Sequence, residues 1–305
     1  MTECPGNHKA GFIAVVGRPN VGKSTLVNRL VGQKVAAVSP RPQTTRHRIS
    51  GVRTTPTYQM VFLDTPGIHR PGSLFNRALV RVALMALKDV DGILWMIDAS
   101  APVSDEDRLV QGHLAGLESP IVIALNKVDL VRPREQLLPV IAECQKLVPT
   151  AEVVPISAIE GVNLDRLEAI LLRHLPEAPP FFPPGQRTDQ PPHLLVAEII
   201  REKVFQLVRQ EVPYAVAVQV DEMEERDTGE MVDIQATVYV EKDSQKGILI
   251  GGGGQMLKRI GQQAREEIEI ILGTRVYLGL WVKVRRAWRK DEEALRRFGY
   301  LPGSA

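Results

Sequence analysis

The stretch GRPNVGKS, residues 17–24, decides how the first half of the chain folds and what it binds. It follows the apolar run FIAVV at 12–16 and precedes apolar residues at helical spacing over 26–30. This pattern predicts a strand, a glycine loop and a helix start. The glycines let successive N–H groups turn inward around a phosphate chain, and the positive helix end adds to the attraction. Lys23 is placed to reach the outer phosphates, and the Ser24 hydroxyl is placed to hold Mg²⁺. The sequence therefore predicts a nucleoside triphosphate site.

Length and composition set the outer limits. With 305 residues the chain is long enough for two domains. The 38 basic and 36 acidic residues nearly cancel, so overall charge does not indicate a nucleic-acid partner. Two cysteines, Cys4 and Cys144, are too few for a disulfide framework and suit a reducing compartment. No apolar run approaches the ~20 residues of a membrane helix, and no secretory signal pattern is visible. We expect a cytoplasmic protein and leave open peripheral contact with the cytoplasmic side of the inner membrane.

Two further segments carry phosphate chemistry. Residues 35–50 contain several prolines and threonines and lack periodicity, so we predict a mobile surface segment. The apolar strand predicted at 58–63 ends in the run DTPG, from Asp64 to Gly67. A carboxylate at the carboxyl edge of a buried strand is well placed to orient the shell of a magnesium ion. Taken alone, this tetrapeptide is also a common turn.

Base recognition is predicted at the ends of two later strands. The apolar strand at 121–125 is followed by Asn126, Lys127, Val128 and Asp129. The Asp129 carboxylate can accept two hydrogen bonds from guanine, a pattern that adenine does not offer. Asn126 either binds another edge of the base or ties loops together, and the stem of Lys127 can lie against the ring. After the strand at 153–156, the N–H groups of Ser157 and Ala158 can meet the guanine carbonyl.

These five segments, in this order, resemble the motif set of the P-loop GTPases. With the alternating strands and helices, they predict an α/β domain with a doubly wound, mostly parallel sheet. The resemblance implies a set of residues that bind GTP: Asn20, Val21, Gly22, Lys23, Ser24, Thr25, Asn126, Lys127, Asp129, Ser157 and Ala158. It implies a catalytic set of Lys23, Thr45, Asp64 and Gly67, with Mg²⁺ held by Ser24 and a threonine. That threonine is Thr44 or Thr45, and the Thr-Thr-Arg run of related GTPases points to Thr45.

Two residues modify the expected hydrolysis. Ile68 stands where Ras-type proteins carry a water-orienting glutamine, so the chain resembles the hydrophobic-substituted class and intrinsic turnover should be slow. Asn20 resembles the residue that holds K⁺ in potassium-stimulated relatives, where the ion would neutralise developing charge. We interpret His47 and His69, which neighbour these loops, as solvated side chains, because phosphoryl transfer needs positioning more than a strong base.

Seven prolines crowd residues 176–192 and mark a domain boundary. We predict a GTPase domain at 9–176, a Pro-rich linker at 177–192 and a smaller α+β domain at 193–302. In the second domain, periodicity predicts a helix at 196–208, strands at 216–220 and 232–240 joined by an acidic loop, a helix at 257–271 and a strand at 276–284.

The run Gly251, Gly252, Gly253 and Gly254, placed between two helices of this domain, resembles the loop of a bacterial type II KH domain. Such a loop lets an RNA backbone approach main-chain N–H groups. A flexible glycine linker is the alternative. KH loops usually carry a basic residue between the outer glycines, and none is present here. Phosphate attraction would then come from Lys246, Lys258 and Arg259 near the loop.

A run that interleaves aromatic and basic residues, WVKVRRAWRK, occupies 281–290. Trp281, Lys283 and Arg285 would share one face of a strand, which suits base stacking and phosphate contact. We predict Lys283, Arg285 and Trp288 as RNA contacts, together with Lys258. The competing interpretation is a solvated basic strand edge.

Across almost its whole length the chain resembles the Era subfamily of the TrmE-Era-EngA-like P-loop GTPases. The resemblance implies a monomeric, GTP-hydrolysing switch that binds ribosomal RNA near the 3′ end of the small-subunit rRNA and assists small-subunit maturation. Two other functions stay open on residues alone. One is a phosphotransferase acting on a small acceptor, and the other is a constitutive RNA-binding protein that needs GTP only for structural integrity.

Overall fold

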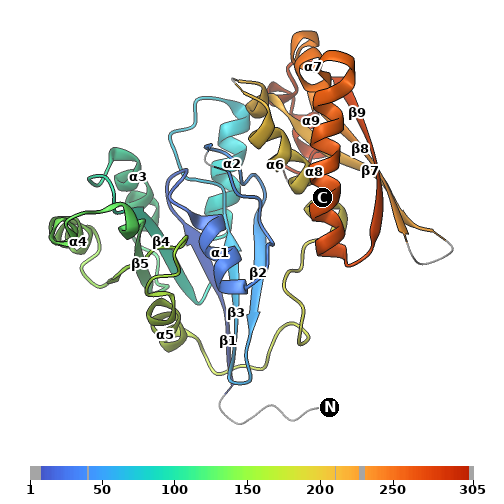
Figure 1. Ribbon diagram of the computed structural model, residues 1–305. Coiled ribbons are helices and arrows are strands. Elements are labelled where there is room, and N and C mark those ends of the chain that lie inside the picture. Colours follow the sequence, from blue (N-terminus) through green and yellow to red (C-terminus); the bar gives the residue numbers. More distant parts are fainter. Residues whose placement is uncertain (1–7, 40, 210, 227–230, 302–305) are drawn as a thin grey trace. The chain divides into compact units, whose positions relative to one another are not determined.

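The computed structural model describes residues 8–39, 41–209, 211–226 and 231–301. The chain forms two compact units, and most of their helices and strands are labelled in Figure 1. The N-terminal unit comprises the described residues up to Ala36, Thr45–Gly72 and Asn76–Asp189, and the C-terminal unit comprises Ala37–Thr44, Ser73–Phe75 and the residues from Gln190 onward. Cys4, Pro40, the end of the acidic loop at 227–230 and position 302 of the predicted domain boundary lie outside the described residues.

A six-stranded sheet forms the centre of the N-terminal unit. Its strands are β1 (Lys9–Val16), β2 (Ile49–Thr54), β3 (Tyr58–Asp64), β4 (Gly92–Asp98), β5 (Ile121–Asn126) and β6 (Glu152–Pro155), in the order β2-β3-β1-β4-β5-β6. Only the β2–β3 pair of this sheet is antiparallel, which confirms the predicted mostly parallel sheet. The strand order reverses between β1 and β4, and ligands of such sheets bind at the carboxyl edge beside this point.

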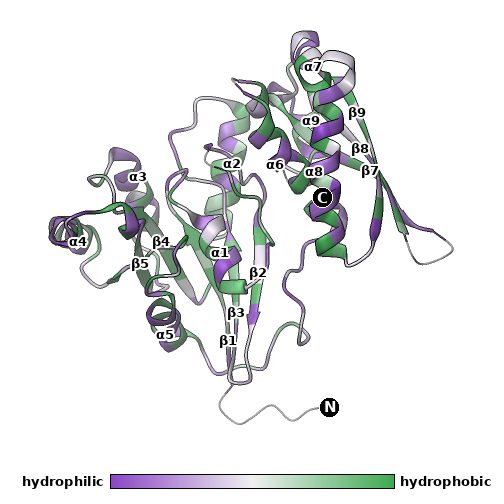
Figure 2. Cartoon of the chain, in the orientation of Figure 1, coloured by the Kyte–Doolittle hydropathy of each residue, from purple (hydrophilic) through white to green (hydrophobic). Residues whose placement is uncertain are grey.

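Helices cover both faces of this sheet. They are α1 (Lys23–Val31), α2 (Leu74–Met85), α3 (Asp105–Leu114), α4 (Leu137–Leu147) and α5 (Leu164–His174). Ile13 and Val15 pack in one core with residues of α1 and α5, whereas Ala14 and Val16 pack in another with residues of α2, α3 and α4. Because both faces are covered, the strands are almost continuously hydrophobic. In Figure 2 these strands are largely green, whereas α3 and α5 carry purple, hydrophilic residues.

The Pro-rich segment is attached to the N-terminal unit up to Asp189. Val52 of β2 donates its N–H to the Arg187 carbonyl at 2.8 Å, and the Ser50 hydroxyl donates to Asp189. The Gln59 amide accepts from the N–H groups of Phe181 and Phe182 at 2.7 and 2.9 Å. Residues 177–189 therefore form a strap along the outer strands, and α6 begins at Pro192.

The C-terminal unit has the predicted order of elements. These are α6 (Pro192–Leu207), β7 (Ala217–Glu225), β8 (Met231–Val240), α7 (Asp243–Ile250), α8 (Gln255–Leu272), β9 (Arg275–Val284) and an additional short helix, α9 (Glu292–Arg297). The three strands lie in sequence order, with β7–β8 antiparallel and β8–β9 parallel. Val196, Ile200, Ile260 and Ile268 of the two long helices pack with Ile234 in one core. No helix within the described ranges is long and apolar enough to cross a membrane.

Candidate functional site

The glycine loop lies at the carboxyl edge of the N-terminal sheet, between β1 and α1. Gly22 has φ 101°, and a Cβ there would lie 2.4 Å from Nδ2 of Asn126, so only glycine fits. The Nζ of Lys23 donates to the carbonyl oxygens of Gly17 and Arg18 at 3.2 and 3.0 Å. Burial lowers the pKa of Lys23 to about 8, although Asp64 opposes this shift. The ammonium group of Lys23 therefore bonds to carbonyl groups of the glycine loop, which is where a phosphate would bind.

Three oxygen-bearing side chains converge beside the loop. The Ser24 hydroxyl donates to Oδ2 of Asp64 at 2.6 Å and lies 2.7 Å from Oγ1 of Thr45. Burial raises the pKa of Asp64 to about 6, and its Oδ1 is buried without a hydrogen-bond partner among the described residues. Mg²⁺ prefers hard oxygen ligands and usually binds with few protein groups, completed by phosphates and water. This donor set and the unpartnered Oδ1 fit a magnesium ion.

The structure distinguishes the two candidate threonines. Thr45 directs its hydroxyl to Ser24 and lies 3.4 Å from Oδ2 of Asp64, whereas the Thr44 hydroxyl donates to the Arg41 carbonyl at 2.8 Å. Both side chains are buried. The geometry thus brings the hydroxyls of Ser24 and Thr45 together with the Asp64 carboxylate, and the Thr44 hydroxyl lies apart from this group.

Asn126 ties loops together, the second of the two roles predicted for it. Its Nδ2 donates to the Val21 carbonyl at 2.7 Å, and its Oδ1 accepts from the N–H of Ala158 at 2.9 Å. The N–H of Ser157 donates to the Val162 carbonyl at 3.3 Å. Both N–H groups predicted to meet guanine therefore already donate within the protein, so a guanine carbonyl would have to share or replace an acceptor. Asp129 is half-buried in a 3₁₀ turn at Val128–Leu130.

A chain of alternating charges lies beside these loops, and two of its members carry no sequence motif. The Nζ of Lys127 lies 2.6 Å from Oδ2 of Asp98, and Nη2 of Arg18 lies 3.5 Å from the same oxygen. The Nε of Arg18 also lies 3.5 Å from Oδ2 of Asp107. Neither Asp98 nor Asp107 was among the predicted site residues. The position of Asp98 at the end of an apolar strand could have indicated it.

The loop after Asp64 lies against the glycine loop. Ile68 is fully buried and donates its N–H to the Gly17 carbonyl at 3.1 Å. Its hydrocarbon side chain has no polar atom that could orient a water molecule. His69 differs from the solvated side chain predicted: its Nδ1 lies 2.9 Å from the Gly67 carbonyl, and its Nε2 is buried. Because a carbonyl only accepts, Nδ1 must carry the hydrogen. Asn20 is exposed, with φ 62°.

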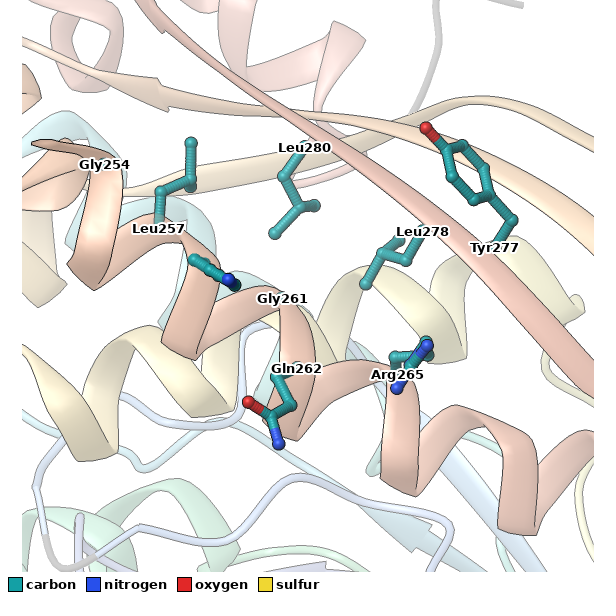
Figure 3. Close-up of a pocket in the computed structure, with 9 residues that line it drawn as sticks. Gly254, Leu257, Gly261, Gln262, Arg265, Tyr277, Leu278 and Leu280 are labelled. Carbon is teal, nitrogen blue, oxygen red and sulfur yellow. The ribbon is translucent and has the colours of Figure 1, made fainter.

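The second predicted site is a groove in the C-terminal unit, beginning at the glycine run. Gly252 and Gly253 are exposed, and a Cβ at either position would meet no atom within 4 Å. Figure 3 shows Leu257 of α8 with Leu278 and Leu280 of β9 around the groove, and these residues line it with Lys258, Gly261, Gln262 and Arg265. The combination of exposed backbone, apolar walls and cations suits single-stranded nucleic acid.

The predicted basic run contributes less to an exposed surface than expected. Lys283 is exposed on β9, whereas Arg285 is half-buried and paired with Asp291 at 2.9 Å. The prediction that Trp288 contacts RNA is wrong, because its side chain is fully buried and its Nε1 donates to the Ala215 carbonyl. β9 ends at Val284, and the 3₁₀ turn at 288–290 directs the indole into an aromatic cluster.

Comparisons with known proteins match both halves of the chain to known families. Residues 12–127 match the family described as 50S ribosome-binding GTPase, and residues 211–289 match the KH domain family. The GTPase Era of Geotalea daltonii is 49% identical over 291 residues, which are 95% of this chain and 97% of that protein. A crystal structure of Era with MgGDPNP and nucleotides 1506–1542 of 16S ribosomal RNA shares 44% identity, with a TM-score of 0.93, over 96% of this chain and 99% of that one. An alanine variant of Aquifex aeolicus Era bound to GDP and AlF₄⁻ matches with the same identity, coverage and TM-score.

Proposed function

Because the chain belongs to the Era family of GTPases, we propose that it is a switch that binds 16S ribosomal RNA near its 3′ end and assists maturation of the small ribosomal subunit. It hydrolyses GTP to GDP and phosphate, with Mg²⁺ as cofactor. The observation that carries the proposal is the exposed glycine loop and apolar groove of the C-terminal unit, joined in one chain to a nucleotide site. The related Era structure holds MgGDPNP and that RNA together.

In hydrolysis, a water oxygen bonds to the γ-phosphorus and the bond to the β–γ bridging oxygen breaks, so GDP leaves. Lys23 places its charge against the outer phosphates, while Gly17 to Gly22 surround them with N–H groups. Ser24, Thr45 and Asp64 are the residues that would hold Mg²⁺ and its water shell. When bound, the ion offsets charge on the β- and γ-phosphates. Asp129 accepts from guanine, and Lys127 lies along the ring.

Switching follows from the position of Thr45. A threonine drawn to Mg²⁺·GTP orders the segment before it, and loss of the γ-phosphate releases it together with the loop from Asp64 to Gly67. RNA would bind with its backbone over Gly252 and Gly253 and its bases against the leucines of the groove. Lys258 and Lys283 supply exposed charge for the phosphates.

Five finer features belong to the proposal. Asn20 would hold a K⁺ ion beside the phosphates, where the ion's charge offsets that of the transition state. The protein would act as a monomer, bind the small ribosomal subunit and work in the cytoplasm. Peripheral association with the inner membrane is included as a secondary location.

The proposal is tested by crosslinking RNA to the protein in cells and sequencing it, comparing the parent with the double variant Gly252→Asp, Gly253→Asp. Both positions have open space around Cβ. The φ of 57° at position 253 strains any side chain, but Asp adopts such a φ more often than most residues, so we expect the fold to persist. We expect the parent to enrich the 3′ end of 16S rRNA and the variant to lose it through charge repulsion. Gly112→Asp is the matched control, because Gly112 is exposed on α3 with equal space. A parent without ribosomal RNA enrichment would overturn the function.

A further inference from the structure

The carboxylate of Asp98 is the meeting point of two cations from different parts of the nucleotide site. Asp98 is the last residue of β4 and is 7% exposed. Its Oδ2 lies 2.6 Å from Nζ of Lys127, which follows β5, and 3.5 Å from Nη2 of Arg18, which lies in the glycine loop. One carboxylate thus contacts the loop that would hold the base and the loop that would hold the phosphates.

The local structure fixes this carboxylate before any ligand arrives. Its Oδ1 accepts from the N–H of Ser100 at 3.0 Å and from the Ser100 hydroxyl at 2.6 Å. Asp98 and Asn126 are paired in the register of β4 and β5, which brings Asp98 next to the residue before Lys127. Burial alone would raise the pKa of Asp98, but hydrogen bonds from Lys127 and Ser100 hold it below its ordinary value. The group is therefore ionised at neutral pH.

Both cations are restricted by this contact. Lys127 has a left-handed backbone with φ 70°, which is uncommon for a residue with a side chain, and its ammonium is fixed at Asp98. Arg18 is held on a second side, because its Nε lies 3.5 Å from Oδ2 of Asp107. Asp107 is itself fixed by a capping box with Ser104 at the start of α3. A fixed ammonium leaves the four-carbon stem of Lys127 in one direction, which lowers the entropy lost when a base packs on it.

We propose that Asp98 is a positioning residue for guanine nucleotides, acting through Lys127 and Arg18 to hold the base loop and the phosphate loop in binding geometry. Its carboxylate oxygens are engaged by Lys127, Arg18 and Ser100, so in this proposal it acts on the nucleotide only through other residues. It should therefore strengthen the binding of GTP and GDP alike and leave the chemical step unchanged. The proposal concerns nucleotide affinity, so it stands or falls separately from RNA binding.

The first test is the release of a fluorescent GDP analogue from the full chain, measured for the parent and for Asp98→Asn. Asparagine keeps the size of the side chain and removes the charge that attracts both cations. We expect release to become faster by about 10- to 100-fold, the KM for GTP to rise and kcat to stay within about twofold. Asp105→Asn is the matched control, because Asp105 is exposed at the start of the same helix as Asp107. Unchanged release in Asp98→Asn, with only thermal stability lowered, would reduce Asp98 to a structural role.

A double-mutant cycle identifies the route. Lys127→Met keeps an apolar stem and removes the ammonium without altering Asp98, so it also serves if Asp98→Asn does not fold. If Asp98 acts through Lys127, the Lys127→Met variant releases GDP faster than the parent. Introducing Asp98→Asn into that variant should then speed GDP release much less than it does in the parent. Arg18→Met in place of Lys127→Met tests the phosphate side in the same way. Fully additive effects in both cycles, or unchanged release in Lys127→Met, would overturn the proposal.

Discussion

Lys23 and Asp64 are buried, ionisable residues whose pKa values are both shifted toward the neutral form. Burial lowers the pKa of Lys23 from 10.5 to about 8 and raises that of Asp64 from 3.8 to about 6. In the folded, nucleotide-free protein, both charges are therefore less favourable than in the unfolded chain at neutral pH. Bound phosphate and Mg²⁺ would make the charges of Lys23 and Asp64 favourable. The two residues therefore suit ligand binding but lower the stability of the nucleotide-free protein.

Asp64→Asn should therefore stabilise the nucleotide-free protein at pH 7.5, by about 1 to 2 kcal/mol in free energy of unfolding. The amide still accepts from Ser24 but carries no buried charge. The pKa of Asp64 is higher in the folded than in the unfolded protein. Its contribution to the free energy of unfolding is therefore fully present below pH 3.8 and is lost as the pH rises through about 6. The measurement is urea unfolding of the parent and Asp64→Asn at pH 7.5 and pH 5. The difference in free energy of unfolding between the two proteins should be smaller at pH 5. The same variant should lose GTP hydrolysis, and a variant less stable than the parent at pH 7.5 would contradict the account.

The two tryptophans of the basic run give a matched pair. Trp288 is fully buried against Phe75 and Phe298, with ring centroids 5.3 and 5.4 Å away, whereas Trp281 is 50% exposed. Trp288→Ala should lower the free energy of unfolding by about 3 to 5 kcal/mol, because it leaves a large cavity. Trp281→Ala should cost less than about 1 kcal/mol. Urea denaturation of both variants measures the difference, and equal losses would be inconsistent with the burial.

Asn20 is the residue expected to bind K⁺ and so to stimulate GTP hydrolysis. GTP hydrolysis should be faster in KCl than in NaCl at equal ionic strength, because a K⁺ ion held by Asn20 would offset the charge that develops in the transition state. Asn20→Ala should remove the difference between the two salts. Equal turnover of the parent in matched buffers would exclude a K⁺ site.

At the scale of elements, α6 is unusual because charged residues lie on its buried side. Glu198, Arg201, Glu202 and Lys203 are all less than 10% exposed. Within the C-terminal unit, two of these residues contact the segment at 37–44: Oε2 of Glu202 accepts the N–H of Val38 at 3.0 Å, and Arg201 donates to the Thr44 carbonyl. α6 thus holds the segment that leads directly into Thr45.

Glu202→Ala should loosen this segment. The N–H of Val38 would lose a charged acceptor, which is worth about 1.5 to 3 kcal/mol, so its amide should exchange roughly 10 to 100 times faster. Hydrogen–deuterium exchange of residues 37–44 is the measurement. Glu224→Ala is the control, because Glu224 is exposed on β7. Unaltered exchange at Val38 would show that other contacts hold the segment.

Much of this element structure could be predicted from sequence, because periods of two and 3.6 residues are local signals. The candidate nucleotide residues were predicted from the order of their motifs at strand ends, and the structure places these segments at the carboxyl edge of the N-terminal sheet. The prediction that Trp288 contacts RNA is wrong because the alternation in WVKVRRAWRK is typical of one exposed strand. In the structure β9 ends at Val284, and the indole of Trp288 is buried. The position of Asp98 at the end of an apolar strand was a local signal, but its pairing with Lys127 and Arg18 is a contact between distant parts of the chain. The packing of residues 37–44 in the C-terminal unit is likewise a long-range feature that no local pattern reveals.

At the scale of the whole molecule, the proposed switch requires that nucleotide and RNA affect each other's binding. An RNA oligonucleotide with the 3′-terminal sequence of 16S rRNA should bind the full chain at least about fivefold more tightly with one of two nucleotides, GDP or a non-hydrolysable GTP analogue. By linkage, the RNA should change nucleotide affinity by the same factor. Fluorescence anisotropy with each nucleotide gives the ratio. Equal affinities would favour constitutive RNA binding.

The strap at 177–189 has a consequence for solubility. β2 is an edge strand of the large sheet, and such an edge offers unpaired N–H and C=O groups to any other extended chain. The strap occupies part of this edge through the bond from Val52 to Arg187 and the contact of Ser50 with Asp189. A chain that is still being synthesised lacks the strap until after its first six strands exist. During that interval the edge of β2 is open to neighbouring copies, so we expect the proline-rich segment, once it emerges, to reduce pairing between nascent chains at this edge.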